Sequence, residues 1–265
     1  ILERLEWLDQ QNRNGHGMIA AFYSLPPSYQ GDLERLVRAS IAKVDLAGAK
    51  QVIGSVHKIG DLVVTRQRWL FSYPRLAAVD PDSKEILKSL LLSVGGIIRD
   101  GIDPEQLKLE EISSMPLRSW LVDFDARLAP HFAALNDQME FMGLQQSSYE
   151  VKSEKDGTAT VEVTNGGEKA TLNFVSVDGM WVPSETDPEK WAESIKLWED
   201  GLAEMPEGSL LAGAAASSVP LIINPILEPA MQAESARELH AVIDGWVSLA
   251  SPMLAQMGDF SLGGQ

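Results

Sequence analysis

Three side chains near the middle of the chain have the types and the spacing to act together. Asp123, Arg127 and His131 follow one another at four-residue intervals, so on a helix they lie along one edge, each within reach of the next. A carboxylate four residues before an arginine is also the ordinary helix ion pair, which contributes about 0.2–0.5 kcal/mol on a surface. The sequence favours a solvated charge ladder and leaves a ligand-binding site as the alternative, which requires His131 to face a pocket.

No other pattern indicates catalysis or metal binding. The four histidines fall outside HExxH and HxH arrangements, no GxSxG sequence marks a nucleophilic serine, and no glycine-rich phosphate loop is present. His16 lies between two glycines, and His57 and His240 lie on predicted helices, so we interpret them as packed or surface residues. Asp80-Pro81-Asp82 and Glu110-Glu111 lack the ligand spacing of a calcium loop. We therefore expect no metal and no cofactor, identify no catalytic residue, and favour a non-catalytic role.

Composition and charge restrict the partners. The 265 residues are 45% hydrophobic and include no cysteine, which excludes disulfides, thiolate nucleophiles and cysteine-bound zinc. The net charge of −16 is concentrated in residues 101–208, which carry 8 basic and 22 acidic side chains. Such a field repels phosphate groups, so we predict no nucleic-acid partner. A protein or a small-molecule ligand, of unknown identity, remains as the expected partner.

Two features bear on location. Residues 208–227 carry no charge, but Ser217, Pro220 and Pro225 interrupt them, and a spanning helix needs about 20 predominantly apolar residues. We interpret this segment as a buried one and predict that the protein is not a transmembrane protein. The chain begins with Ile1 rather than Met, so the native N-terminus is not visible, and removal of a signal peptide is compatible with this start.

Residues 149–183 predict an antiparallel meander. Runs in which apolar and polar residues alternate are separated by Asp156-Gly157, Asn165-Gly166-Gly167 and Asp178-Gly179, and such pairs supply the positive φ that tight hairpins require. The remainder of the chain shows helical periodicity. The predicted class is therefore α+β: mostly helical, with a small four-stranded antiparallel meander packed against helices.

Apolar residues at three- and four-residue intervals predict the surrounding helices. One long helix is predicted from Pro116 to the start of the meander, with a kink near Pro130. On the helix that follows the meander, Trp191 and Trp198 share a stripe that we expect to clamp it onto the sheet or the helices. Residues 31–63 predict two helices that bend near Asp45, the first with Leu33, Leu36, Val37, Ile41 and Val44 on one face. The predicted starts of the other helices are Leu2, a cap at Asp82, a cap at Asp103, a capping box at Thr186 and a last start near Pro229.

The meander also carries a resemblance. Residues 158–183, TATVEVTNGGEKATLNFVSVDGMWVP, resemble the closing meander of bacterial NTF2-like (cystatin-like) domains, in which a D-G-x-W step recurs, here Asp178-Gly179-Met180-Trp181. The resemblance implies a curved sheet; the catalytic members of the family resemble isomerases and dehydratases with an Asp–His pair inside the cone. Asp123 and His131 match no motif of the family, so no catalytic residue is carried over. Residues 21–37 are similar to segments of exported bacterial proteins, which implies a periplasmic or cell-envelope location.

Together these observations predict three regions packed as one unit: helical residues 1–115, an NTF2-like α+β module at 116–207, and a helical region at 208–265. The leading hypothesis for function is a non-catalytic exported or envelope-associated protein that binds a ligand or a partner. One alternative is an NTF2-like small-molecule isomerase or dehydratase that uses the edge formed by Asp123, Arg127 and His131. The other is a scaffold or oligomerisation module that uses the stripe of Trp191 and Trp198.

Overall fold

The computed structural model of the chain describes residues 1–142, 147–165, 167–210 and 214–261. Most of them are helical, and one antiparallel sheet is present, which confirms the predicted α+β class. The helices are α1 (Leu2–Arg13), α2 (Gly17–Tyr23), α3 (Pro27–Ala42), α4 (Leu46–Thr65), α5 (Gln67–Leu70), α6 (Pro81–Gly101), α7 (Leu109–Ile112), α8 (Leu117–Phe141), α9 (Pro188–Glu204), α10 (Ala214–Gln232) and α11 (Ala236–Ser261), with short 3-10 turns at Pro74–Ala78 and Ser184–Thr186.

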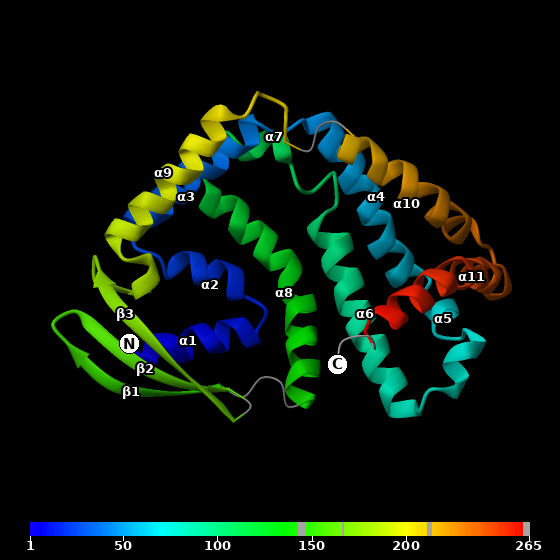
Figure 1. Cartoon of the computed structure of the whole chain (residues 1–265), viewed down its shortest axis with the longest axis horizontal. Coiled ribbons are helices and arrows are strands. Elements are labelled where there is room, and N and C mark those ends of the chain that lie inside the picture. The colour runs from blue at the N-terminus through cyan, green and yellow to red at the C-terminus, as the bar shows by residue number, and fades with distance from the viewer. Residues whose placement is uncertain (143–146, 166, 211–213, 262–265) are drawn as a thin grey trace.

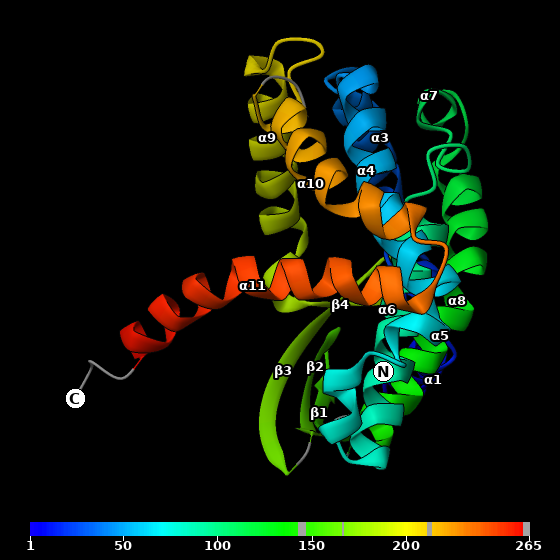
Figure 2. The ribbon, with the colours of Figure 1, turned by 90° about the vertical axis from the view of Figure 1, so that its right-hand side faces the viewer.

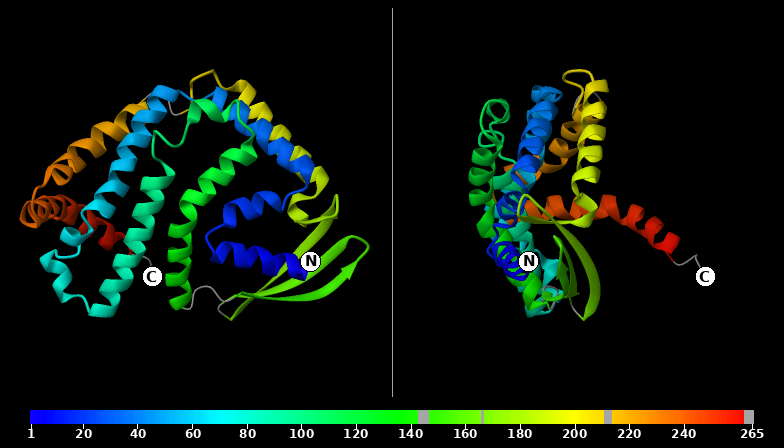
Figure 3. Two further views of the ribbon diagram at one scale, coloured as in Figure 1. Left: turned by 180° about the vertical axis from the view of Figure 1, so that it is seen from behind. Right: turned by 90° about the vertical axis from the view of Figure 1, so that its left-hand side faces the viewer.

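The chain forms an arch (Figure 1). The sheet lies at one end with α1 and α2, whereas α4, α5, α10 and α11 form the other end, and α6 and α8 run between them. Seen from behind, α3 and α9 lie side by side above the sheet (Figure 3). Helix α11 extends away from the other helices towards the C-terminus (Figure 2).

The sheet is the predicted four-stranded meander. Its strands are β1 (Ser147–Lys155), β2 (Thr158–Asn165), β3 (Glu168–Val177) and β4 (Met180–Pro183), paired in sequence order and all antiparallel. At the first turn Asp156 and Gly157 have φ of 52° and 75°, and at the last Asp178 and Gly179 have φ of 52° and 76°. Two successive positive φ values define the type I′ geometry that matches strand twist, which confirms the predicted role of these pairs. Gly166, in the middle turn, lies outside the described residues.

One face of the sheet is packed. Ala159, Val161 and Phe174 form a buried cluster, and Ile1 and Leu5 from the start of the chain pack against it. These positions share a face because Ala159 pairs with Phe174 across the two central strands. The first helix therefore covers the packed face of a sheet that begins about 140 residues later in the sequence.

Several predicted helix starts need correction. The cap of α6 is Asp80, whose side chain accepts from the Ser83 N–H, so Asp82 lies inside the first turn. The cap of α9 is Asp187 rather than Thr186, whose hydroxyl donates to the Pro183 carbonyl instead. In each case proline at the first helical position moves the cap to the residue before it. Asp103 caps only a turn, because its side chain accepts from the Glu105 N–H and no helix follows until α7.

The C-terminal region also differs from expectation. The uncharged segment forms most of α10, which contains Pro220, Pro225 and Pro229, and the last helix starts at Ala236 rather than near Pro229. One side of α10 is buried through Leu227 and Ala230 against α4 and α11, while Leu221 and Ile222 on its other side are exposed. Within the part of the chain that the structure describes, no helix has both the length and the apolar character that crossing a bilayer demands.

Small residues let the central helices approach closely. Gly95 and Gly96 on α6 are buried: a side chain at Gly95 would meet Val63 of α4, and one at Gly96 would overlap the ring of His131 on α8. This arrangement holds α4, α6 and α8 together as one layer. The glycine pair therefore serves helix packing.

Candidate functional site

Helix α8 carries all three predicted site residues, and it passes through the centre of the arch (Figure 1). Its 25 residues bury Leu117, Leu121 and Leu128 on one side and continue through Pro130 without a break. The long predicted helix is therefore confirmed, and its edges present side chains both to α6 and to solvent.

The structure gives His131 and Arg127 a common neighbour that the sequence did not indicate, Asp100 at the end of α6. The Nε2–H of His131 donates to the Asp100 carboxylate at 2.7 Å, and Nη1 of Arg127 donates to its backbone carbonyl at 2.8 Å. Arg99 also binds this carboxylate through two hydrogen bonds, of 2.7 and 3.1 Å. The bonds from His131 and Arg127 connect the end of α6 to α8, and the Arg127 bond gives one of the last backbone carbonyls of α6 a donor.

The electrostatics of Asp100 follow from these contacts. The hydrogen bond from Arg99 lowers the pKa of Asp100 most strongly, burial opposes that shift, and the hydrogen bond from His131 adds to it. An Asp–His pair can act in acid–base catalysis when the ring faces a substrate. Here one face of the His131 ring lies against Gly96, and neither cavity described below is lined by His131.

Asp123 is separate from this cluster. Among the described residues no ion pair joins Asp123 to Arg127, so the predicted charge ladder is broken at its first step. Arg127 instead turns towards Asp100 and towards Gln106, whose side-chain oxygen it contacts at 3.3 Å. Asp123 is exposed, and together with Arg127 it lines a cavity on the outer side of α8.

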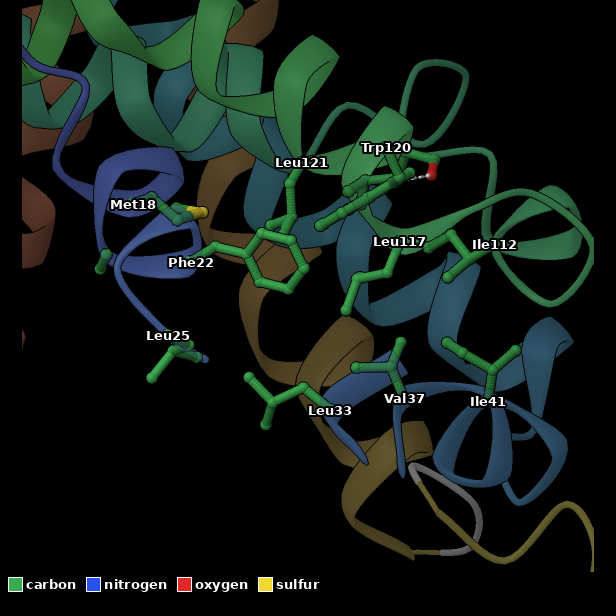
Figure 4. Close-up of a pocket in the computed structure, with 12 residues that line it drawn as sticks. Met18, Phe22, Leu25, Leu33, Val37, Ile41, Ile112, Leu117, Trp120 and Leu121 are labelled. Carbon is green, nitrogen blue, oxygen red and sulfur yellow. Dashed lines mark hydrogen bonds between the residues drawn. The ribbon is translucent and has the colours of Figure 1, made fainter. Parts of the chain in front are cut away.

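An apolar cavity of about 610 Å³ lies between α2, α3 and α8 (Figure 4). In α3, Leu33, Val37 and Ile41 recur every four residues and form one wall, while α8 forms the opposite wall. We call this the apolar cavity; its twelve lining residues are Met18, Ala21, Phe22, Leu25, Leu33, Val37, Ile41, Leu107, Ile112, Leu117, Trp120 and Leu121. The apolar face of α3 is visible in the sequence, but no helix was predicted at α2, so the cavity was not predicted.

A second cavity, of about 380 Å³, lies beside the first, and polar or charged side chains contribute to its lining together with apolar surface. We call this the polar cavity; it is lined by Glu105, Gln106, Lys108, Met115, Trp120, Asp123, Ala126 and Arg127. Trp120 belongs to both cavities. Its indole stacks on Phe124, with ring centroids 4.7 Å apart, and its N–H donates to the Leu107 carbonyl at 3.1 Å (Figure 4), so the ring is held in place between the two cavities.

The structure also places a buried acid on α8. Asp125 is only 3% exposed. It accepts hydrogen bonds from the His16 Nδ1–H at 2.6 Å and from the Ile19 N–H at 3.2 Å. The second bond supplies an acceptor for a backbone N–H in the first turn of α2, which has no partner within the helix. Gly15, at φ of 84°, lies so close to the Ala129 backbone that a side chain would overlap it. The His16 side chain is half-exposed and serves a structural hydrogen bond, which is compatible with its interpretation as a packed or surface residue. An acid three residues before Leu128, on the apolar side of a predicted helix, was the available signal for Asp125.

Within the described ranges, no group of three or more His, Asp or Glu side chains is arranged to hold a metal ion. No known protein family, curated protein or solved structure matches this chain. The resemblance of the meander to NTF2-like domains therefore stays a prediction. The argument for function rests on the geometry of the two cavities.

Proposed function

We propose that the protein is a non-catalytic binding protein that holds the apolar chain of a small molecule in the apolar cavity. The observation that carries the proposal is the lining: apolar side chains form the walls of this open cavity, and the polar side-chain group among them, the Trp120 N–H, is already bonded to the Leu107 carbonyl. Its volume of about 610 Å³ is within the roughly 300–1,000 Å³ of ligand-binding sites. Such a site binds by removing apolar surface from water, which favours a chain over a polar molecule.

Direct titration tests this function. Decanol, an uncharged molecule with a single alkyl chain, should bind in isothermal titration calorimetry with a negative heat-capacity change, because apolar surface is buried. Ala21 lines the cavity and is exposed, so Ala21→Trp should fill the cavity without disturbing the buried core and should abolish binding. Ala192→Trp, at an exposed position of α9 outside the cavity, is the matched control and should bind as the wild type does.

A smaller cavity of about 420 Å³ is the competing location. It lies along α9 and is formed by side chains that include Leu197, Trp198 and Met205. If Trp198→Ala removes decanol binding and Ala21→Trp leaves it intact, the ligand occupies that place and the proposal is wrong. Retention of binding by Trp198→Ala and its loss in Ala21→Trp supports the apolar cavity.

The oligomerisation alternative has one observation in its favour. Trp191 packs inside the protein, but Trp198 and Leu197 on the same helix are 63% and 73% exposed. Two such side chains together are an apolar patch of the kind that binds partners. Sedimentation of the wild type and of Trp198→Ala tests this alternative: a wild type that remains monomeric at high concentration removes it.

The enzymatic alternative and the cellular location are two further hypotheses, and each rests on one observation. The Asp100–His131 hydrogen bond resembles an acid–base pair, yet the His131 ring is packed against Gly96, so the geometry favours binding over catalysis. An exported or envelope-associated location rests on the similarity of residues 21–37 to exported proteins. Sequencing of the mature N-terminus and fractionation of the source cells test the location.

A further inference from the structure

The polar cavity begins where the apolar cavity ends, and this arrangement suggests what kind of molecule occupies both. We infer that the ligand is a single-chain amphiphile with a cationic ammonium head, whose chain lies in the apolar cavity and whose head lies in the polar cavity beside Trp120. This inference rests on the proposed function, since it places the chain in the same space.

The two cavities share their walls. In the segment before α7, Leu107 lines the apolar cavity while its neighbours Gln106 and Lys108 line the polar one. On α8, Leu117 and Leu121 line the first and Asp123 and Arg127 the second, with Trp120 common to both. A chain that leaves the apolar cavity along Trp120 therefore meets charged side chains, as the head of an amphiphile requires.

The cations of the polar cavity are already engaged. The Lys108 ammonium lies 3.6 Å from the Glu111 carboxylate. The Arg127 guanidinium donates to the Asp100 carbonyl and to the Gln106 side chain, and it lies over the Phe124 ring with its central carbon 5.4 Å from the ring centroid. The N–H groups of Arg127 are directed to neutral acceptors of the protein rather than to an incoming anion, although no ion pair with a carboxylate is present for Arg127 among the described residues. This geometry makes a fatty acid or an alkyl sulfate the less favoured ligand.

The anions of the same cavity make no short ion pair, although the Lys50 ammonium, which is paired with Glu110, also interacts with the charge of Glu105. Among the residues that the structure describes, neither Glu105 nor Asp123 lies within ion-pair distance of a Lys, Arg or His side chain. Both lie in the region 101–208, which carries 8 basic and 22 acidic side chains, so the surrounding field attracts cations. The cavity holds two acidic and two basic side chains, and its two carboxylates are the groups that can approach a positive head.

Aromatic rings add to this preference. Trp120 and Phe124 are stacked with an interplanar angle of 14°. An ammonium group over an indole face gains about 0.5–1 kcal/mol at an exposed site. Because Trp120 lines both cavities, a head placed there contacts the ring while the chain remains in the apolar cavity.

Three decyl compounds with the same chain test the inference: decyltrimethylammonium, decanol and decyl sulfate, each titrated below its micelle concentration at low ionic strength. We expect the ammonium compound to bind about three- to tenfold more tightly than decanol, from one or two contacts of about 0.5–1 kcal/mol each, and decyl sulfate to bind most weakly. The preference should decrease at high salt, because the head is near solvent.

A double variant locates the preference. Glu105 and Asp123 are both exposed, so Glu105→Gln with Asp123→Asn should keep the fold and its decanol affinity while reducing the ammonium preference to less than twofold. The matched control is Glu168→Gln with Glu193→Gln, two exposed acids on β3 and α9 whose loss changes the net charge equally. The control should keep the full preference.

The outcomes separate the two proposals. Absence of decanol binding contradicts the proposed function itself. Decanol binding without tighter binding of the ammonium compound, or with tighter binding of decyl sulfate, overturns the inference about the head and leaves the proposed function standing. Equal loss of the preference in the double variant and in its control assigns it to overall charge and also overturns the inference.

Discussion

The Nδ1–H of His16 donates a hydrogen bond of 2.6 Å to the carboxylate of Asp125, 109 residues further along the chain. The same carboxylate accepts the Ile19 N–H in the first turn of α2 and is almost completely buried. One side chain of α8 thus fixes the position of α2, and α2 supplies one wall of the apolar cavity. The pair is structural, but the proposed binding site depends on it.

Asp125→Ala should therefore destabilise the protein by about 1–3 kcal/mol, because the partly buried Ile19 N–H and the half-exposed His16 ring lose their acceptor. Urea unfolding followed by circular dichroism measures the difference in the free energy of unfolding. Asp123→Ala, two residues away on the same helix but exposed, should change this free energy by no more than about 0.5 kcal/mol. Similar losses in the two variants would contradict the role of the buried carboxylate.

Gly96→Ala should destabilise the protein by about 1–3 kcal/mol, because the added methyl group overlaps the His131 ring and forces α6 and α8 apart. Gly31, exposed in the interior of α3 with no atom near an added methyl group, provides the opposite case. Gly31→Ala should stabilise the protein by about 0.5–1 kcal/mol through helix propensity. Thermal unfolding of both variants checks the prediction. An unchanged stability of Gly96→Ala would show that α6 and α8 can move apart without cost.

The two tryptophans of α9 should behave differently. Trp191 stacks on Tyr29 with ring centroids 4.2 Å apart, and its N–H donates to Asp32 at 2.8 Å, whereas Trp198 is 63% exposed. Trp191→Ala should cost about 2–4 kcal/mol of unfolding free energy, and Trp198→Ala less than about 0.5 kcal/mol. Chemical denaturation of the two variants tests this, and a large loss in Trp198→Ala would mean that a second molecule buries that ring.

Asp100 should contribute to the pH dependence of stability. Its pKa is lowered in the folded protein, first by the hydrogen bond from Arg99, so as pH falls the unfolded state takes up a proton before the folded state does. The stabilisation is therefore complete above the ordinary carboxyl pKa of about 3.9 and is lost as the pH falls through the lower folded value.

Arg99→Gln should raise the pKa of Asp100 towards its ordinary value and reduce the loss of unfolding free energy between about pH 6 and about pH 3. An NMR titration of the Asp100 carboxyl carbon measures the first effect, and urea unfolding at several pH values measures the second. A pKa that stays unchanged in the variant would assign the shift to the His131 hydrogen bond instead.

Local chemistry made much of the fold predictable. The strands and turns of the meander follow from alternation and from Asx-Gly pairs, whose φ preferences act within four residues, and the long helix from Pro116 follows from its apolar period. The helix starts at Asp82 and Thr186 were misplaced by two residues and by one, because proline had moved the caps to Asp80 and Asp187. These errors were still local, and the rule that corrects them can be read from the sequence.

The candidate site was harder to predict from the sequence than the fold. Sequence spacing placed Asp123, Arg127 and His131 on one edge of a helix, and they do share α8. The contacts of Arg127 and His131, however, go to Asp100 and Gln106, and Gly96 of α6 lets Asp100 and His131 approach because it leaves room for the His131 ring. Spacing along one helix defines which residues could touch, but not which neighbouring helix offers a better partner.

The amino-acid sequence by itself determined the α+β class, the four-stranded meander, the acidity of residues 101–208 and most helices, because these depend on composition and on interactions between residues close in the chain. Only the tertiary structure decided that α2, α3 and α8 form the walls of an open apolar cavity and that Trp120 lies between it and the polar cavity. A cavity is the volume that packing leaves unfilled, so it depends on distances between helices far apart in sequence, which no local pattern encodes.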